Sequence, residues 1–253
     1  MKFTQNLKGL AVAAIAVFAV SVGSANAGEK IRIGTEGAYP PFNAVDKDGN
    51  LVGFDVDIAK ALCSEMKADC TFVKQDWDGI IPALLARKFD AIIASMSITE
   101  DRKKAVDFSE RYYTNQLQFI GKSGMTLDVS LVGLNGKTVG AQRATISGDW
   151  LEKNREGAKI RLYDTQENAF LDLSSGRLDG ILADVFVNDA WLKSDAGKDY
   201  EFKGDPVFSD DLIGIAIRKG DPLRTKLNAA IKAIVANGTY AKINAKYFAV
   251  SIY

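Results

Sequence analysis

The 253-residue sequence contains no histidine. Histidine is the commonest general base and the commonest transition-metal ligand, so its absence excludes Ser-His-Asp catalysis, Cys-His catalysis and histidine-based zinc sites. Neither sign of charge is in excess, because 32 Lys and Arg residues balance 32 Asp and Glu residues. Without a basic field, the chain is not expected to bind nucleic acid or anionic lipid.

Long apolar runs are scarce, and the one near the N-terminus has a specific pattern. Lys2 and Lys8 precede an uncharged stretch over residues 9–22, and an Ala-Asn-Ala end follows at residues 25–27. This order is typical of a secretory signal peptide, and the apolar stretch is shorter than the roughly 20 residues of a membrane-spanning helix. We predict a signal peptide over residues 1–27, cleaved after Ala27, and a secreted mature chain.

Cysteine occurs only twice, as Cys63 and Cys70. In a secreted chain an even pair of cysteines favours a disulfide. Apolar residues recur at helical spacing over residues 55–67, and residues 70–73 form a strand candidate, so the bridge would join a helix to the next strand. Zinc is a poor alternative with two soft ligands and no histidine, whereas two buried free thiols remain an alternative.

Short apolar runs alternate with longer amphipathic segments along the rest of the chain. This alternation predicts an α/β fold with mainly parallel sheets and helices on both faces. The strand candidates are residues 31–34, 70–73, 91–94, 117–120, 138–140, 181–183 and 213–217. The further helix candidates are residues 79–87 after Asp78, 100–107 after Thr99, 166–174, and 222–236 after Asp221.

Two segments of the chain, residues 85–95 and residues 174–184, are similar to each other. Each combines a helix end, a tight turn and a buried strand that ends in a polar residue, Ser95 or Asp184. The match is short, and any helix-turn-strand unit could produce it. If it reflects a repeat, both residues lie at the carboxyl ends of strands in two lobes, where open α/β sheets bind ligands.

Several motifs follow one another from Ile31 to the C-terminus. They are Ile33-Gly34-Thr35-Glu36 with Tyr39-x-Pro41-Phe42, Gly53-Phe54-Asp55-Val56-Asp57, DWDGIIPAL at residues 76–84, Ser95-Met96-Ser97-Ile98-Thr99-x-x-Arg102, and Asn237-Gly238-Thr239-Tyr240. Together and in order, they resemble the periplasmic polar-amino-acid-binding proteins of ABC transporters. Within that family the chain resembles the lysine/arginine/ornithine- and histidine-binding group, which the paired cysteines also fit.

The resemblance implies a type II periplasmic binding protein fold, with two lobes joined by two hinge crossings. Each lobe is expected to be a mainly parallel sheet flanked by helices. Lobe 1 would comprise residues 28–115 and 212–253, and lobe 2 residues 116–211. A ligand that contacts both lobes favours the closed form because it binds that form more tightly. A membrane permease could then recognise the closed protein, which we expect to be a periplasmic monomer.

The resemblance also assigns roles in binding the backbone of a free amino acid. Arg102, in the first turn of a helix, is expected to hold the α-carboxylate with its forked donors and the neighbouring backbone N–H groups. Asp184, helped by Ser95, is expected to bind the α-ammonium group. Ser97 and Thr145 would add neutral hydrogen bonds. Taken singly, Arg102 also fits a solvated surface arginine, and Asp184 a turn residue at a strand end.

Recognition of the ligand side chain is assigned to Tyr39 and Trp77, two aromatic residues that can enclose an alkyl stem or a guanidinium group. Glu36 and Asp55 would face a distal positive charge. The alternatives are that Trp77 packs in the core at a helix start and that Asp55 caps the helix that begins there.

Departures from the family pattern leave the ligand open. Glu36 replaces the usual aspartate, Ala94 stands where a serine is common, and residues 142–145 replace a glycine-containing turn. Arginine, ornithine and lysine are the expected ligands, and an opine or the neutral amide glutamine is the alternative. Cyclohexadienyl dehydratases have a similar architecture, but an amino acid held by Arg102 and Asp184 is fully ion-paired and leaves no obvious base. We therefore expect a binding protein without catalytic residues, cofactor or metal.

Overall fold

The computed structural model describes Met1 and residues 28–253. The rest of the predicted signal peptide and its cleavage site lie outside the described residues. Within the described part of the chain, no helix has both the length and the apolar character that a membrane crossing needs.

An eight-stranded sheet runs through the molecule in the order β5-β1-β6-β11-β7-β10-β8-β9. Its strands are β1 (Lys30–Thr35), β5 (Asp69–Lys74), β6 (Ala91–Ile92), β7 (Val106–Lys122), β8 (Thr138–Gln142), β9 (Lys159–Tyr163), β10 (Gly180–Asp184) and β11 (Tyr200–Arg218). The two outer groups, β5-β1-β6 and β10-β8-β9, pair in parallel. The central strands β7 and β11 pair antiparallel with each other and with the outer groups. The predicted α/β class is confirmed.

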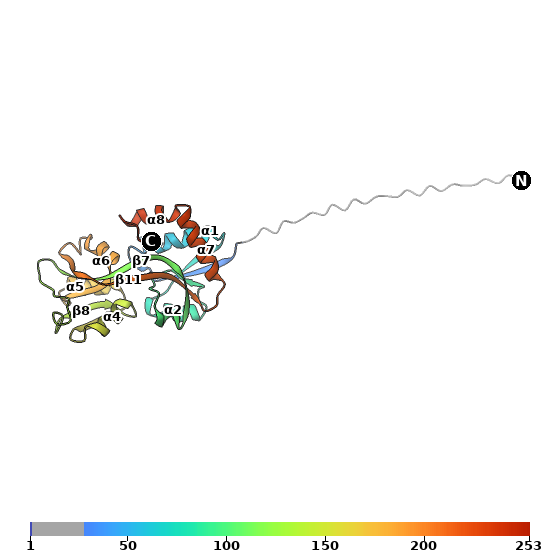
Figure 1. Cartoon of the computed structure of the whole chain (residues 1–253). Helices are drawn as coiled ribbons and strands as arrows, with labels where there is room; N and C mark the ends of the chain where they lie inside the picture. Colours follow the sequence, from blue (N-terminus) through green and yellow to red (C-terminus); the bar gives the residue numbers. More distant parts are fainter. Residues whose placement is uncertain (2–27) are drawn as a thin grey trace.

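The helices divide into two sets around the ends of this sheet (Figure 1). The half of the molecule with β5-β1-β6, the first half, carries α1 (Phe54–Glu65), η1 (Trp77–Gly79), α2 (Ile80–Leu85), α3 (Glu100–Lys103), α7 (Leu223–Ala236) and α8 (Thr239–Tyr247). It also carries a small sheet of β2 (Ala38–Tyr39), β3 (Asn43–Val45) and β4 (Leu51–Val52). The second half, with β10-β8-β9, carries α4 (Ile146–Asn154), α5 (Gln166–Ser174) and α6 (Val185–Leu192). Strands β7 and β11 join the two halves.

These two connecting strands are much longer than the sequence predicted. β7 has 17 residues and β11 has 19, whereas only residues 117–120 and 213–217 were expected to be strands. Buried polar residues such as Asn115 and Asp211 interrupt the apolar pattern where the strands pass between the halves. The pairing of β11 with β7 also contains register shifts.

Several predicted helix boundaries are corrected by the structure. The helix that begins after Thr99 ends at Lys103 rather than Asp107, because Val106 already starts β7. Thr99 does cap this helix, since its Oγ1 accepts a hydrogen bond from the backbone N–H of Arg102 at 3.1 Å. Asp78 does not cap α2, because it lies inside η1.

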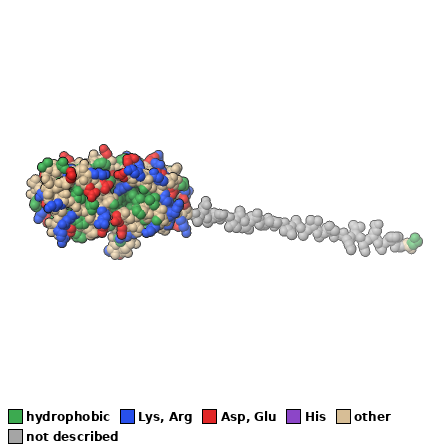
Figure 2. Space-filling model, turned by 90° about the horizontal axis from the view of Figure 1, so that it is seen from below, with side chains coloured by type: hydrophobic (Ala, Val, Ile, Leu, Met, Phe, Trp, Pro, Cys, Tyr) green, Lys and Arg blue, Asp and Glu red, His purple; other side chains and the backbone are tan. Residues whose placement is uncertain are grey.

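Apolar residues fill the space between the helices and the sheet. In the first half, η1 and α2 bury Trp77, Ile80 and Leu84 against β6 and β11. In the second half, Leu151 of α4 packs with Leu117 of β7 and residues of β8 and β10. On the face shown in Figure 2, basic and acidic side chains are mixed, as the balanced charge of the sequence implies.

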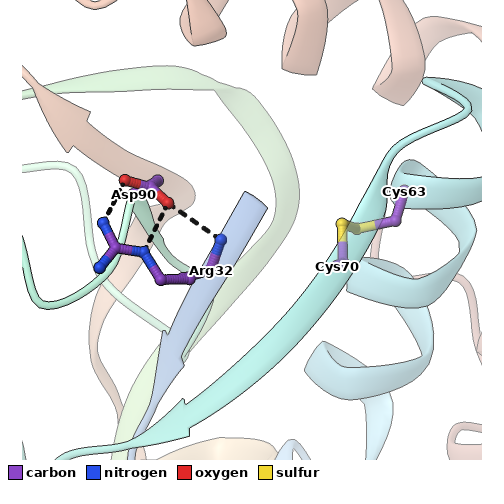
Figure 3. Close-up of a disulfide and its surroundings, with 4 residues drawn as sticks. All are labelled: Arg32, Cys63, Cys70 and Asp90. Carbon is purple, nitrogen blue, oxygen red and sulfur yellow. Dashed lines mark hydrogen bonds and ion pairs between the residues drawn. A yellow bond between two sulfur atoms is a disulfide. The ribbon is translucent and has the colours of Figure 1, made fainter. Parts of the chain in front are cut away.

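Covalent and ionic links fix β1 and its neighbours (Figure 3). Cys63 of α1 and Cys70 of β5 form a disulfide with Cα atoms 6.1 Å apart, so the predicted pairing is confirmed. Arg32 of β1 donates two side-chain hydrogen bonds to Asp90, from Nε at 3.0 Å and from Nη2 at 2.9 Å. Its backbone N–H donates to the same carboxylate at 3.0 Å. These contacts hold β1 against the turn before β6, on the amino-terminal side of the strands and away from the carboxyl ends.

Candidate ligand-binding site

A cavity lies between the two halves and is lined by residues of both. Its lining residues are Glu36, Tyr39, Ala94, Trp77, Ser95, Ser97, Arg102, Gln142, Thr145, Ile146 and Asp184. Glu36 directly follows β1, Ser95 follows β6, and Asp184 ends β10. The carboxyl ends of parallel strands from both halves therefore face one cavity, which is where open α/β sheets place their ligands.

The structure brings together every predicted binding residue except Asp55. Ser95 and Asp184, which the short internal similarity paired, both lie in the wall of the cavity. Asp55 is completely buried beneath it. Gly53, rather than Asp55, precedes α1, and no side chain caps that helix, so the interpretation of Asp55 as a helix cap was wrong.

Arg102 provides a fixed cation at one side of the cavity. Its Nη1 donates to the carbonyl of Ser97 at 3.0 Å, and its Nη2 donates to the carbonyl of Ala144 at 3.0 Å. The guanidinium carbon lies 5.3 Å from the centre of the Trp77 ring, within the range of a cation–π contact. Burial lowers the pKa of Arg102, but an arginine stays protonated in proteins. The guanidinium has five N–H donors, so it can also hold a carboxylate.

Asp184 lies near a second buried carboxylate, that of Asp211. Burial, followed by the negative charge of Asp211, raises the pKa of Asp184, while hydrogen bonds from Asn115 and Tyr39 and the charge of Arg102 oppose the rise. Asn115 also donates its Nδ2 to Asp211 at 3.1 Å. Burial raises the pKa of Asp211 as well, so the pair favours a bound proton when no cation is near, and an ammonium group placed there would stabilise the ionised carboxylates in place of that proton.

Glu36 is a third buried carboxylate, only 4% exposed. Its Oε1 accepts a hydrogen bond from Nε2 of Gln142 at 2.6 Å, a contact between the two halves. Burial raises the pKa of Glu36 to about 7, although the bond from Gln142 favours the ionised form. A cation beside Glu36 would compensate for its lost hydration.

The aromatic residues have both a packing and a lining role. Tyr39 and Trp77 are each 7% exposed and line the cavity. Trp77 also packs in the apolar cluster of η1 and α2. It is therefore both a core residue, as the alternative interpretation predicted, and a lining residue of the cavity. Its Nε1 donates to the carbonyl of Ala144 at 3.0 Å.

The turn before α4 makes several contacts across the cavity. Ala144 has a left-handed backbone (φ 55°), and its carbonyl accepts from both Trp77 and Arg102 of the first half. Thr145 caps α4 by accepting from the backbone N–H of Gly148 at 3.2 Å, and its hydroxyl donates to the carbonyl of Gln142 at 2.7 Å. These bonds define a closed arrangement of the two halves.

Sequence reasoning missed some of the residues that shape the site. Gln142 and Ala144 lie in the turn that departs from the family pattern. That departure was a signal for this turn, but the sequence did not show that the turn contacts Glu36, Trp77 and Arg102. Asn115 and Asp211 are polar residues within long strands, and the sequence gives no signal that would link them to Asp184.

Comparison with known proteins places this geometry in a family. Residues 31–250 match the bacterial extracellular solute-binding proteins, family 3, and the chain belongs to this family. The L-arginine-binding protein of Pseudomonas aeruginosa is 44% identical over 248 residues, which cover 95% of this chain and 96% of that protein.

Solved structures of binding proteins have the same fold. An ancestral arginine-binding protein bound to arginine matches with a TM-score of 0.83 at 40% identity, covering 88% of this chain and 99% of that one. An ancestral arginine-binding protein bound to glutamine matches with a TM-score of 0.82 at 40% identity, covering 87% and 98%. The predicted two-lobed binding-protein fold is confirmed.

Proposed function

We propose that the protein closes two lobes around a free cationic amino acid, with arginine as the leading ligand, and delivers it to the membrane permease of an ABC transporter. Lobe 1 comprises residues 28–115 and 212–253, and lobe 2 residues 116–211. The protein acts in the periplasm as a monomer after removal of residues 1–27. It is a binding protein and not an enzyme.

The distribution of charge in the cavity carries this proposal. Arg102 is placed to bind the α-carboxylate, and Asp184 to bind the α-ammonium group. Glu36 supplies a separate buried carboxylate for a positive group at the far end of the ligand side chain. A neutral side chain would leave Glu36 without a cation, and burial would then favour the protonated form of the carboxyl group.

The aromatic residues in the lining of the cavity favour a ligand side chain with an apolar stem and a planar end. Tyr39 and Trp77 offer flat surfaces for an alkyl stem or a planar guanidinium group. Arginine fills both requirements.

Lobe closure is expected because the site residues belong to both lobes. The α-carboxylate would be held from lobe 1 by Arg102 and Ser97, and the α-ammonium would meet Asp184 of lobe 2. A ligand that contacts both lobes stabilises the closed form, and the permease can distinguish that form from the open one.

Glutamine is a second candidate ligand, and a specific observation favours it. Gln142 places an amide group next to Glu36, and the carboxamide of a glutamine ligand could exchange hydrogen bonds with both. The ancestral relative that was solved with glutamine is a precedent in the same fold.

Calorimetric titration tests the proposal. The protein is unfolded and refolded to remove co-purified ligand, and is then titrated with L-arginine, L-ornithine, L-lysine and L-glutamine. We expect saturable binding of arginine with one site per chain. Binding of glutamine without binding of arginine would overturn the cationic ligand. Turnover of prephenate or arogenate would overturn the assignment as a non-enzyme.

A further inference from the structure

Asp55 lies beneath the ligand cavity without lining it. It belongs to the first turn of α1, and its side chain is 0% exposed. A carboxylate buried to this extent is costly unless hydrogen bonds compensate for its lost hydration. Its role therefore depends on the groups that donate to it.

Three side chains donate hydrogen bonds to Asp55. Oδ2 accepts from Ser95 Oγ at 3.0 Å and from Asn43 Nδ2 at 3.0 Å. Oδ1 accepts from the hydroxyl of Tyr112 at 2.7 Å. Burial raises the pKa of Asp55 to about 6, and these donors limit the rise, so the group is mainly ionised at neutral pH. An ionised carboxylate only accepts, and the three donor protons are therefore directed at Asp55.

This arrangement fixes the polarity of Ser95. A serine hydroxyl has one proton, and here that proton is given to Asp55, so only lone pairs of Oγ remain for the cavity. An ammonium group is a donor with no acceptor, which matches such an oxygen, whereas a carboxylate does not. Ser95 also has a left-handed backbone (φ 53°), a conformation that costs roughly 1–2 kcal/mol for a residue with a side chain. The bond to Asp55 helps to hold it there.

A second branch of the same network leads to Glu36. Asn43, which is 1% exposed, donates to Asp55 and at the same time accepts at Oδ1 from the backbone N–H of Gly37 at 2.8 Å. Gly37 directly follows Glu36 and has a left-handed backbone (φ 73°). Asn43 thus links the buried carboxylate to the turn that carries Glu36.

We propose that Asp55 is a positioning residue that orders two walls of the site before ligand binds. It makes Ser95 a hydrogen-bond acceptor for the α-ammonium group, and through Asn43 it fixes the turn after Glu36. All members of the network belong to residues 28–115, so it does not depend on lobe closure. The role of Ser95 rests on the proposed amino-acid ligand, whereas the link to Gly37 does not.

The first test is a double-mutant cycle. Asp55→Asn keeps the size of the side chain but replaces one accepting oxygen with a donor. Affinity for L-arginine is measured by calorimetry in the wild type, Asp55→Asn, Ser95→Ala and the double variant. We expect Asp55→Asn to weaken binding about 10- to 100-fold, roughly 1.4 to 2.7 kcal/mol, and to have an effect at least threefold smaller when Ser95 is already alanine. Equal loss in both backgrounds would overturn the action through Ser95.

Tyr112→Phe is the matched control for this cycle. It removes the donor to Oδ1 of Asp55 and keeps the side chains of Ser95 and Asn43 that donate to Oδ2. We expect L-arginine affinity within threefold of the wild type. A loss as large as that of Asp55→Asn would mean that the network supports the fold in general rather than the two walls of the site.

The second test needs no ligand. Amide hydrogen exchange at Gly37 is compared in the ligand-free wild type, Asp55→Asn and Asn43→Asp. The last variant keeps the acceptor for Gly37 but loses the donor to Asp55, and it remains informative if Asp55→Asn does not fold. We expect exchange at Gly37 to accelerate about tenfold or more in both variants, and exchange at Gly148 of lobe 2 to stay unchanged. Unchanged exchange at Gly37 would overturn the proposal; a wild type that binds no arginine would instead overturn the proposed function.

Discussion

Substitution of Glu36 best distinguishes binding of a cationic ligand from binding of a neutral one. Glu36→Gln keeps the shape of the side chain and removes its charge. The hydrogen bond from Gln142 Nε2 to Oε1, 2.6 Å long, can persist because an amide oxygen also accepts. The substitution therefore changes mainly the second oxygen, which becomes an NH2 donor.

The burial of Glu36 sets the size of the expected effect. The residue is 4% exposed, so a guanidinium group that reaches it forms a desolvated, charged hydrogen bond. Such bonds contribute about 1.5 to 3 kcal/mol, and arginine affinity should fall roughly 10- to 150-fold. A solvent-exposed pair would lose about 1 kcal/mol or less and would depend on salt. Glutamine affinity should stay level or rise, because the new amide matches its carboxamide.

Calorimetry of both ligands with both proteins provides the measurement. It is performed at pH 8, above the pKa of about 7 that burial gives Glu36. Asp78→Asn is the matched control, because it removes the same charge from a side chain that is 52% exposed and lies 3.9 Å from Arg143, outside the lining of the cavity. Arginine affinity should change less than threefold in this control.

Two outcomes would refute the reasoning. Equal losses of arginine and glutamine affinity in Glu36→Gln would mean that Glu36 supports the cavity structurally, through its contact with Gln142. A gain in arginine affinity would mean that no cationic group approaches Glu36 at all.

Three further predictions concern pH, the carboxylate subsite and the disulfide. The pKa of Glu36 is raised from 4.5 to about 7, so its contribution to the stability of the ligand-free closed protein is full below pH 4.5 and is lost as pH rises through 7. Because arginine needs the ionised form, its affinity should rise between pH 5 and 8, and titrations that give a flat profile would contradict this. Arg102→Lys should weaken every amino-acid ligand by about 2 to 5 kcal/mol, because lysine lacks the planar fork; thermal-shift titration checks this, and retained wild-type affinity would remove Arg102 from the site. Replacing Cys63 and Cys70 with alanine should lower the free energy of unfolding in urea by about 2 to 3 kcal/mol, given the short closed loop, and an accompanying loss of arginine binding would contradict a purely structural role.

The local sequence pattern was sufficient to predict the strands whose carboxyl ends border the site. Apolar runs predicted β1, β6 and β10, and the rule that ligands bind at the carboxyl ends of parallel strands selected Ser95 and Asp184. The cap at Thr99 was also predicted, because a threonine before an acidic first turn is a local signal.

The local pattern could not predict contacts between segments that are distant in the sequence. The bond between Glu36 and Gln142 joins residues 106 positions apart, and it exists only when the two halves are closed. The pairing of Asn115 with Asp211 depends on the register of β7 and β11, which bulges shift. Neither the closure nor the register is encoded in the few residues around each position.

The sequence by itself determined the α/β class, the disulfide partners and most of the residues that line the cavity, but β9, α4, α6, α8 and the small sheet of β2, β3 and β4 were not among its candidates. The predicted features depend on short-range periodicity, on composition and on motifs that resemble a family. The tertiary structure alone decided where the side chain of Asp55 lies, because an aspartate at the start of a helix has the same local signature whether its side chain caps the helix, faces a ligand or turns inward. The inward orientation follows from the donors Asn43, Ser95 and Tyr112, which come from separate strands and turns and meet only in the folded lobe.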